Sequence, residues 1–262
     1  MPKFFILPKD ISSDQAIIRG GDAHHIRRVL RLKANDEITI NCQGRDLLAR
    51  IETISPSEVR LRIMEHLPSP FQNKNSLVLV QGIPKHSTMD LILQKSTELG
   101  VEEIMPLASS RSFVNEQRTV SEGRWQRWQK ICQEAAKQCG RSTVPKLHHP
   151  LDLPAVCSQV VKENRILPLL LWEKAQQSPL KSILAGRRRV HGREEEEDRE
   201  SGTREGNKIF ILVGPEGSFS GDEIQMAIQA GFIPVSCAPW ILRAETAALY
   251  ALSIIQYEFN FP

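Results

Sequence analysis

The chain of 262 residues lacks several features that define large protein classes. Its five cysteines are scattered and form no C-x-x-C pair, which predicts reduced thiols and neither a disulfide framework nor a zinc site. The pairs His24-His25 and His148-His149 lack the spacing of helical metal ligands, so we expect no metal. No apolar run reaches the ~20 residues of a membrane span, and the first residues lack a signal-peptide core. The sequence therefore favours a cytoplasmic protein with no membrane segment.

A phosphate-binding lysine loop is also missing, which disfavours nucleotide hydrolysis. The chain has instead an acidic glycine turn, Gly-Pro-Glu-Gly at residues 214–217, between a buried apolar run and a helix start. Open α/β sheets bind cofactors at such strand–turn–helix junctions. Because Glu216, Asp222 and Glu223 make this turn acidic, it suits a phosphate poorly. The turn favours a cationic or neutral nucleoside ligand, for which S-adenosylmethionine is the candidate.

The distribution of apolar residues divides the chain into two parts. Residues 1–70 hold short runs, several of alternating polarity, which predict a small β-barrel. Two prolines mark residues 67–75 as a linker. From residue 75 to residue 262, continuous apolar runs alternate with helical patterns, as in a domain built around a parallel sheet. The expected strands lie at residues 37–41, 46–51, 59–64, 77–82, 104–107, 166–172, 209–213 and 234–237.

Capping residues predict where three helices start. Asp22 is expected to cap a short helix in the first part. Residues 87–90 and residues 220–223 both have the spacing of a capping box, in which a Ser and an acidic residue bind each other's backbone amide. Gly100 and Gly231 are expected to end the two helices that follow.

One segment is almost entirely charged. Between Arg187 and Glu205 there are six arginines and seven acidic residues with a single valine, so the segment cannot bury apolar surface. This composition predicts a disordered insertion over residues 186–206. A regulatory or RNA-binding role for the segment is the alternative.

Positive charge gathers in the middle of the chain. Residues 108–150 hold eight Lys and Arg against three Asp and Glu, although the net charge of the whole chain is only +3. Residues 121–140 have the pattern of a helix with two distinct faces. The apolar stripe consists of Trp125, Trp128, Cys132, Ala135 and Cys139. The opposite face carries Arg127, Lys130, Glu134, Lys137 and Arg141.

A cationic face on a helix beside a β-barrel favours RNA binding, since arginine pairs with phosphate and stacks on bases. The alternatives are a solvated helix face and ordinary surface arginines on the barrel. The residues that we expect to contact RNA are Arg28, Arg31, Arg111, Lys137, Gln138 and Arg141.

Several blocks of sequence together resemble one family. They are Lys-Phe-Phe-Ile at 3–6, His-Ile-Arg-Arg-Val-Leu-Arg-Leu at 25–32, Gln-Lys-Ser-Thr-Glu-Leu-Gly-Val at 94–101, Glu-Ala-Ala-Lys-Gln-Cys-Gly-Arg-Ser at 134–142, the glycine turn, and Ile-Leu-Arg-Ala-Glu-Thr-Ala at 241–247. In this order they are similar to the RsmE-type 16S ribosomal RNA uridine-N3 methyltransferases of the SPOUT superfamily. The resemblance runs nearly end to end.

The resemblance implies an α/β fold in which a SPOUT domain with a trefoil knot and a parallel sheet follows a small PUA-like β-barrel. It implies a homodimer that acts on 16S ribosomal RNA or on the small ribosomal subunit, with S-adenosylmethionine bound in the knot. Carried over residue by residue, the cofactor-binding positions are Leu212, Val213, Gly214, Glu216, Gly217, Ile241, Leu242, Thr246 and Ala247.

Two residues are candidates for catalysis. Uridine N3 must lose a proton before it attacks the methyl group, so Arg243 is expected to stabilise negative charge on the uracil oxygens. Glu245 is expected to orient Arg243 or to accept the proton. The alternative for both is capping and ion pairing at the start of the last helix, over residues 245–257. The chain departs from the family at Ser218, where many relatives have a second glycine, and at residues 237–240.

Two other functions stay open from the sequence. One is a methyltransferase of the same superfamily that acts on transfer RNA or on a ribose hydroxyl. The other is a catalytically silent RNA-binding module, which would bind RNA without the cofactor.

Overall fold

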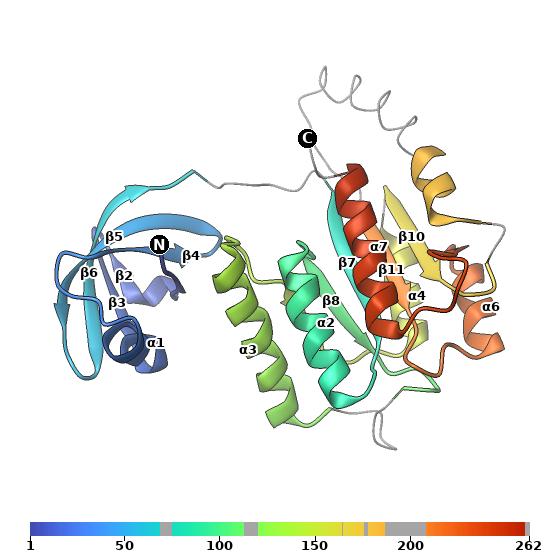
Figure 1. Cartoon of the computed structure of the whole chain (residues 1–262), viewed down its shortest axis with the longest axis horizontal. Helices are drawn as coiled ribbons and strands as arrows, with labels where there is room; N and C mark the ends of the chain where they lie inside the picture. Colours follow the sequence, from blue (N-terminus) through green and yellow to red (C-terminus); the bar gives the residue numbers. More distant parts are fainter. Residues whose placement is uncertain (69–74, 113–119, 164, 176–177, 187–207, 260–262) are drawn as a thin grey trace. The chain divides into compact units, whose positions relative to one another are not determined.

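The computed structural model describes residues 1–68, 75–112, 120–163, 165–175, 178–186 and 208–259 (Figure 1). The charged segment at 187–205 and most of the expected linker lie outside these residues. Contacts divide the chain into two units. The first unit comprises Met1–Gln72 and Ala136–Val144, and the second comprises Asn73–Ala135 and Pro145–Pro262.

The first unit is built on a six-stranded sheet of order β1-β4-β5-β6-β3-β2. β1 runs parallel to β4, and the other pairs are antiparallel. Buried aliphatic side chains from most of these strands form its core. The three strands predicted here are confirmed as β4, β5 and β6, while β1, β2 and β3 were not predicted. The strands are β1 (Lys3–Phe5), β2 (Ile11–Ser12), β3 (Gln15–Arg19), β4 (Glu37–Cys42), β5 (Arg45–Ile54) and β6 (Glu58–His66).

A short helical segment follows β3, but its start differs from the prediction. Helix α1 (Gly20–His24) has Arg19 at its N-cap and continues into a π-helical turn at His25–Val29. Asp22 lies inside the helix, so its predicted role as N-cap is wrong. Its carboxylate accepts a hydrogen bond from Lys137 Nζ at 2.9 Å instead.

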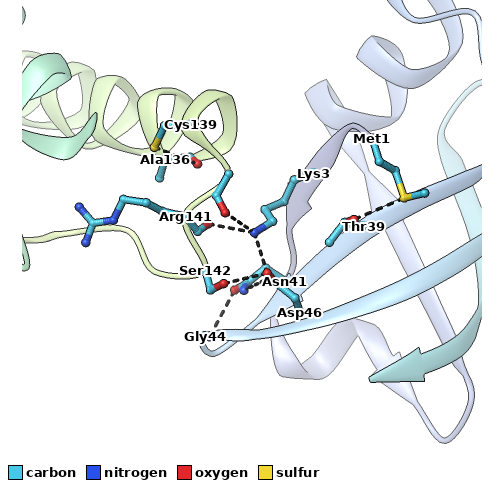
Figure 2. A network of polar contacts seen from close by, with 11 residues as sticks. Met1, Lys3, Thr39, Asn41, Gly44, Asp46, Ala136, Cys139, Arg141 and Ser142 are labelled. Atoms are coloured by element: carbon cyan, nitrogen blue, oxygen red, sulfur yellow. Dashed lines mark hydrogen bonds and ion pairs between the residues drawn. The ribbon is translucent and has the colours of Figure 1, made fainter. Parts of the chain in front are cut away.

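The second segment of this unit, residues 136–144, is bound to the sheet by a buried ion pair (Figure 2). Lys3 Nζ donates to Asp46 Oδ2 at 2.7 Å and to the backbone oxygen of Gly140 at 2.7 Å. Ser142 Oγ donates to the same carboxylate oxygen at 2.7 Å. Burial raises the pKa of Asp46, but the hydrogen bonds from Asn41, Lys3 and Ser142 outweigh this and hold the pKa below its usual value.

The second unit contains a six-stranded parallel sheet of order β12-β10-β11-β7-β8-β9. Four consecutive residues of β7, Leu77 to Val80, are fully buried. Such continuous burial is typical of parallel strands covered on both faces, and it confirms the prediction of a parallel sheet. The strands are β7 (Ser76–Gly82), β8 (Glu103–Leu107), β9 (Lys146–Leu147), β10 (Ile166–Leu171), β11 (Lys208–Val213) and β12 (Ile233–Val235).

Helices cover both faces of this sheet. Val78, Val80 and the alternate residues of β11 share one core with buried side chains of α4 (Leu153–Lys162) and α6 (Gly221–Gln229). Because successive side chains point to opposite faces, Leu77 and Leu79 lie on the other face. Helices α2 (His86–Glu98) and α7 (Ala244–Phe259) contact each other, as Figure 1 shows in teal and red. No helix among the described residues combines the length and apolarity that a bilayer span requires.

The capping predictions had mixed outcomes. The capping box at 220–223 is confirmed, with both reciprocal hydrogen bonds present. The one predicted at 87–90 is wrong, because α2 starts at His86 with Lys85 at its N-cap. Asp90 instead accepts two hydrogen bonds from Arg127. Helix α3 (Glu122–Cys139) buries the predicted tryptophan stripe, but Cys139 at its end is exposed and not buried as predicted.

Candidate cofactor pocket

The largest concentration of predicted site residues surrounds a pocket of about 760 Å³ in the second unit. The pocket lies beyond the carboxyl ends of β10, β11 and β12, and residues that follow β7 and β8 also line it. In this sheet β8 and β9 lie on one side of β7, whereas β11, β10 and β12 lie on the other, so the strand order reverses direction at β7. Ligands of open α/β sheets bind at such a switch point.

The first wall of the pocket is the glycine turn, residues 214–217, which packs too closely for larger residues. A Cβ on Gly214 would lie 3.2 Å from Ser218 Cα, and one on Gly217 would lie 3.1 Å from Arg111 Cβ. Beneath the turn, a Cβ on Gly82 would lie 2.5 Å from Pro215 Cδ. A side chain at Gly82 would therefore clash with Pro215, and side chains at Gly214 and Gly217 would require their neighbours to move by a few tenths of an ångström.

Ser218 follows the glycine turn with φ of 58°, in the left-handed region. A side chain in this region costs about 1–2 kcal/mol. The family resemblance placed a glycine here in many relatives, and the backbone conformation gives the physical reason. The Ser218 hydroxyl donates to Glu173 Oε2 at 3.3 Å, which ties the turn to the end of β10.

Hydrogen bonds from other segments hold the glycine turn. Gln81 Nε2 donates to the backbone oxygen of Gly214 at 3.3 Å. The backbone amide of Lys85, at the start of α2, donates to Glu216 Oε1 at 3.0 Å. Glu216 thus binds the N-terminus of a helix more than a hundred residues earlier in the chain, which places its acidic group at a positive helix end.

The second wall is the segment from Val235 to Ala247, which leads into α7. Trp240 and Ile241 are 70% and 80% exposed, although both are large and apolar. Burial raises the pKa of the Cys237 thiol to about 11, so this thiol is protonated at neutral pH. Arg243 is exposed and Glu245 half-buried, and both line the pocket. In the described part of the chain no ion pair joins them.

A third wall, at the end of β10, was not predicted as part of the site. Leu171, Trp172 and Glu173 line the pocket because β10 pairs with β11 directly beside the glycine turn. The strand itself was predicted correctly. Its position next to β11 depends on the strand order, which the sequence pattern does not reveal.

Seven of the nine predicted cofactor residues line the pocket: Val213, Gly214, Glu216, Gly217, Ile241, Leu242 and Ala247. The other two lie elsewhere. Leu212 is only 1% exposed and packs in the core against α4 and α6. Thr246 lines a second, more apolar pocket of about 860 Å³ along α7.

The predicted RNA-binding residues separate into two groups. Arg111 belongs to the second unit and lines the cofactor pocket. The other five belong to the first unit, where Arg28, Arg31 and Gln138 are exposed. Lys137 forms an ion pair with Asp22, and only 12% of its side chain is exposed.

Comparisons with known proteins define the class to which this fold and pocket belong. Residues 72–256 match the family described as an RNA methyltransferase domain. Residues 18–64 match the RNA methyltransferase PUA domain, which identifies the first unit's sheet as PUA-like. The chain belongs to this family of RNA methyltransferases.

Individual relatives of the chain share one name. Ribosomal RNA small subunit methyltransferase E of Mesomycoplasma hyopneumoniae is 29% identical over 256 residues, which cover 97% of this chain and 98% of the relative. The protein of the same name from Bacillus subtilis is 26% identical, covering 92% of this chain and 89% of its own. A crystal structure of the Neisseria gonorrhoeae enzyme of that name, bound to S-adenosyl methionine, has a TM-score of 0.80 at 28% identity, covering 99% and 98% of the two chains.

Proposed function

We propose that this chain transfers a methyl group from S-adenosylmethionine to N3 of a uridine in 16S ribosomal RNA. The observation that carries the proposal is the pocket beyond the carboxyl ends of β10, β11 and β12, which the glycine turn and the start of α7 line together. Relatives named for small-subunit ribosomal RNA methylation cover this chain almost completely, and one of them has been crystallised with the cofactor.

The residues of the pocket fit S-adenosylmethionine. This cofactor carries a cationic sulfonium and an amino acid group with both charges, and it supplies a methyl group that is already activated. The pocket presents three acidic side chains, Glu173, Glu216 and Glu245, and three basic ones, Lys85, Arg111 and Arg243. Gly214 and Gly217 also line the pocket, so ligand atoms can approach their backbone without a side chain in between.

Arg243 is the proposed catalytic residue that faces the base. Among the described residues its guanidinium makes no hydrogen bond or ion pair, so it can donate to the uracil oxygens as N3 loses its proton. Glu245, which also lines the pocket, is the proposed proton acceptor. Since N3 lies on the Watson–Crick edge, the target uridine must be unpaired when it enters.

RNA binding is proposed to rest on the first unit. Arg28, Arg31, Gln138 and Arg141 all belong to it, and the first three are exposed. Figure 2 shows the Arg141 side chain extending away from the ion pair that holds its backbone. The ribosomal RNA partner makes the cytoplasm the proposed location.

A homodimer is proposed to form through α7. The second pocket is lined by Leu91, Tyr250, Ile254 and Tyr257, and Tyr257 is 74% exposed. Contiguous exposed apolar surface of this kind marks interaction sites. Sedimentation of the purified protein should show a dimer, and Tyr257→Asp should shift it toward the monomer.

The function is tested by mass spectrometry of ribosomal RNA from cells that lack this protein. Loss of one 3-methyluridine is expected, and its restoration by the intact gene is the control. An unchanged 3-methyluridine content contradicts the proposal. Methyl loss from transfer RNA or from a ribose would support the related methyltransferases instead. Calorimetry with S-adenosylmethionine separates all of these from a silent RNA-binding module, which would bind no cofactor.

A further inference from the structure

The loop after β8 is bound to the segment that follows the glycine turn. The Ser110 backbone amide donates to Glu223 Oε1 at 2.7 Å, and its hydroxyl donates to Glu223 Oε2 at 2.9 Å. Glu223 also accepts the Ser220 amide as part of the capping box of α6. Burial raises the pKa of Glu223, but these hydrogen bonds outweigh it and lower the pKa, so the carboxylate stays charged.

Arg111, the next residue, reaches the glycine turn itself. Its Nη1 donates to the backbone oxygen of Gly217 at 2.9 Å and approaches that of Phe219 at 3.5 Å. Its side chain lies so near Gly217 that a Cβ there would be 3.1 Å from Arg111 Cβ and 3.4 Å from Arg111 Cδ. The two carbonyls flank Ser218, the residue with φ of 58°. One guanidinium therefore bridges both sides of a strained residue at the rim of the cofactor pocket.

We propose that Arg111 positions the glycine turn for S-adenosylmethionine, and that it does not serve as an RNA contact. The proposal rests on the function proposed above for the pocket. Charge-assisted hydrogen bonds from Arg111 hold the backbone of residues 217–219 in a conformation that Ser218 disfavours by itself. When the guanidinium is removed, the turn adopts the binding-competent conformation for a smaller fraction of the time. The apparent dissociation constant of the cofactor equals its intrinsic value divided by that fraction, so it rises.

Arg111→Met tests the proposal, because methionine keeps the apolar stem and removes the donors. Calorimetry should show a Kd for S-adenosylmethionine raised by about tenfold or more if a tenth or less of the molecules keep the competent turn. The affinity for ribosomal RNA should not change. Lys146→Met is the matched control: it removes an exposed cation on β9, beside Glu103 at the start of β8, and should leave both affinities unchanged.

The second variant separates positioning from direct contact with the cofactor. Glycine adopts φ of 58° without strain, so Ser218→Gly in the Arg111→Met background should restore most of the cofactor affinity. A raised Kd that Ser218→Gly does not restore would assign Arg111 a direct contact and overturn the proposal. Weakened RNA binding with unchanged cofactor binding would overturn it as well.

A measurement without ligand makes the role of Arg111 independent of the proposed function. The Ser218 backbone amide donates to the Pro215 oxygen at 2.9 Å, so its hydrogen exchange reports the closed turn. Exchange at Ser218 should quicken in Arg111→Met and stay unchanged in Lys146→Met. Equal exchange in wild type and Arg111→Met refutes the positioning role, whereas failure of the wild type to bind the cofactor refutes the function of the pocket.

Discussion

Two walls of the same pocket are held in place very differently. The glycine turn accepts hydrogen bonds from Gln81, Lys85 and Arg111, and the adjoining Ser218 donates one to Glu173. These four partners belong to other parts of the second unit. Among the described residues, none from 237 to 242 takes part in a hydrogen bond, and Trp240 and Ile241 are largely exposed. The contrast distinguishes a preorganised wall, to which the proposed function assigns the cofactor, from an adaptable wall, to which it assigns the uracil base.

The largest effect is expected at the adaptable wall, at Arg243. Removing a group that stabilises charge in the transition state lowers the rate about 10²- to 10³-fold. Arg243→Ala should therefore lower kcat by about that factor, with the Kd of S-adenosylmethionine within about twofold, as measured by methyl incorporation and calorimetry. Unchanged turnover would show that this wall contributes no chemistry.

Gly82→Ala is expected to break the preorganised wall. Its Cβ would lie 2.5 Å from Pro215 Cδ and 2.6 Å from Pro215 N, and the backbone atom cannot move aside. Overpacking of this kind costs about 1–3 kcal/mol, and chemical denaturation should show a loss in that range together with weaker cofactor binding.

Gly221→Ala provides the control for that variant. A Cβ there meets no atom within 4 Å, although Gly221 lies only a few residues after the glycine turn. Its stability should equal or slightly exceed that of the wild type. Equal effects of Gly82→Ala and Gly221→Ala would contradict the close packing beneath the turn.

Glu223 gives the preorganised wall a pH dependence. Its folded-state pKa is lowered, so its stabilising contribution is present above the unfolded-state pKa of about 4.3 and is lost as pH falls through the folded value. Glu223→Gln should lower the free energy of unfolding at pH 7 by about 1 kcal/mol, the usual contribution of a helix cap. The difference from wild type should shrink in acid. A difference that grows on acidification would have the wrong sign.

The smallest effect is expected at Ser218. Glycine relieves about 1 kcal/mol of left-handed strain, but it adds about 0.5 kcal/mol of chain entropy to the unfolded state and loses the hydrogen bond to Glu173, so Ser218→Gly should change the stability by less than about 0.5 kcal/mol. Ser218→Ala loses the same hydrogen bond and also keeps the strain, so it should be less stable than the wild type and than Ser218→Gly. Thermal unfolding of the three proteins gives the order directly.

The sequence predicted local features well. Apolar runs gave the buried strands β7, β10 and β11, and the family blocks at 214–217 and 241–247 led to residues that line one pocket. These successes depend on contacts between neighbours in sequence or on a resemblance that already contains the fold. Neither the apolar runs nor the family blocks predict that β10 lies next to β11, so Glu173 was not predicted as a pocket residue.

Long-range polar contacts account for the other differences. Asp22 and Asp90 look like helix caps because of their local spacing, yet each is paired with a cation far along the chain, Lys137 and Arg127 respectively. Lys3 also makes contacts with residues far along the chain, because its ammonium group donates to the backbone oxygens of Gly140 and Arg141, just after α3. A pairing between distant residues leaves no periodicity in the sequence, so it could not be predicted from one chain.

The central claim is that this pocket directs a methyl group to one uridine of 16S ribosomal RNA. Ribosomal RNA from cells that lack the protein can be incubated with the purified chain and labelled S-adenosylmethionine, digested, and analysed by mass spectrometry. We expect one labelled 3-methyluridine in 16S RNA, and strongly reduced label with Arg243→Ala. Label on a ribose, label on another base, or no label in the wild-type reaction would contradict it.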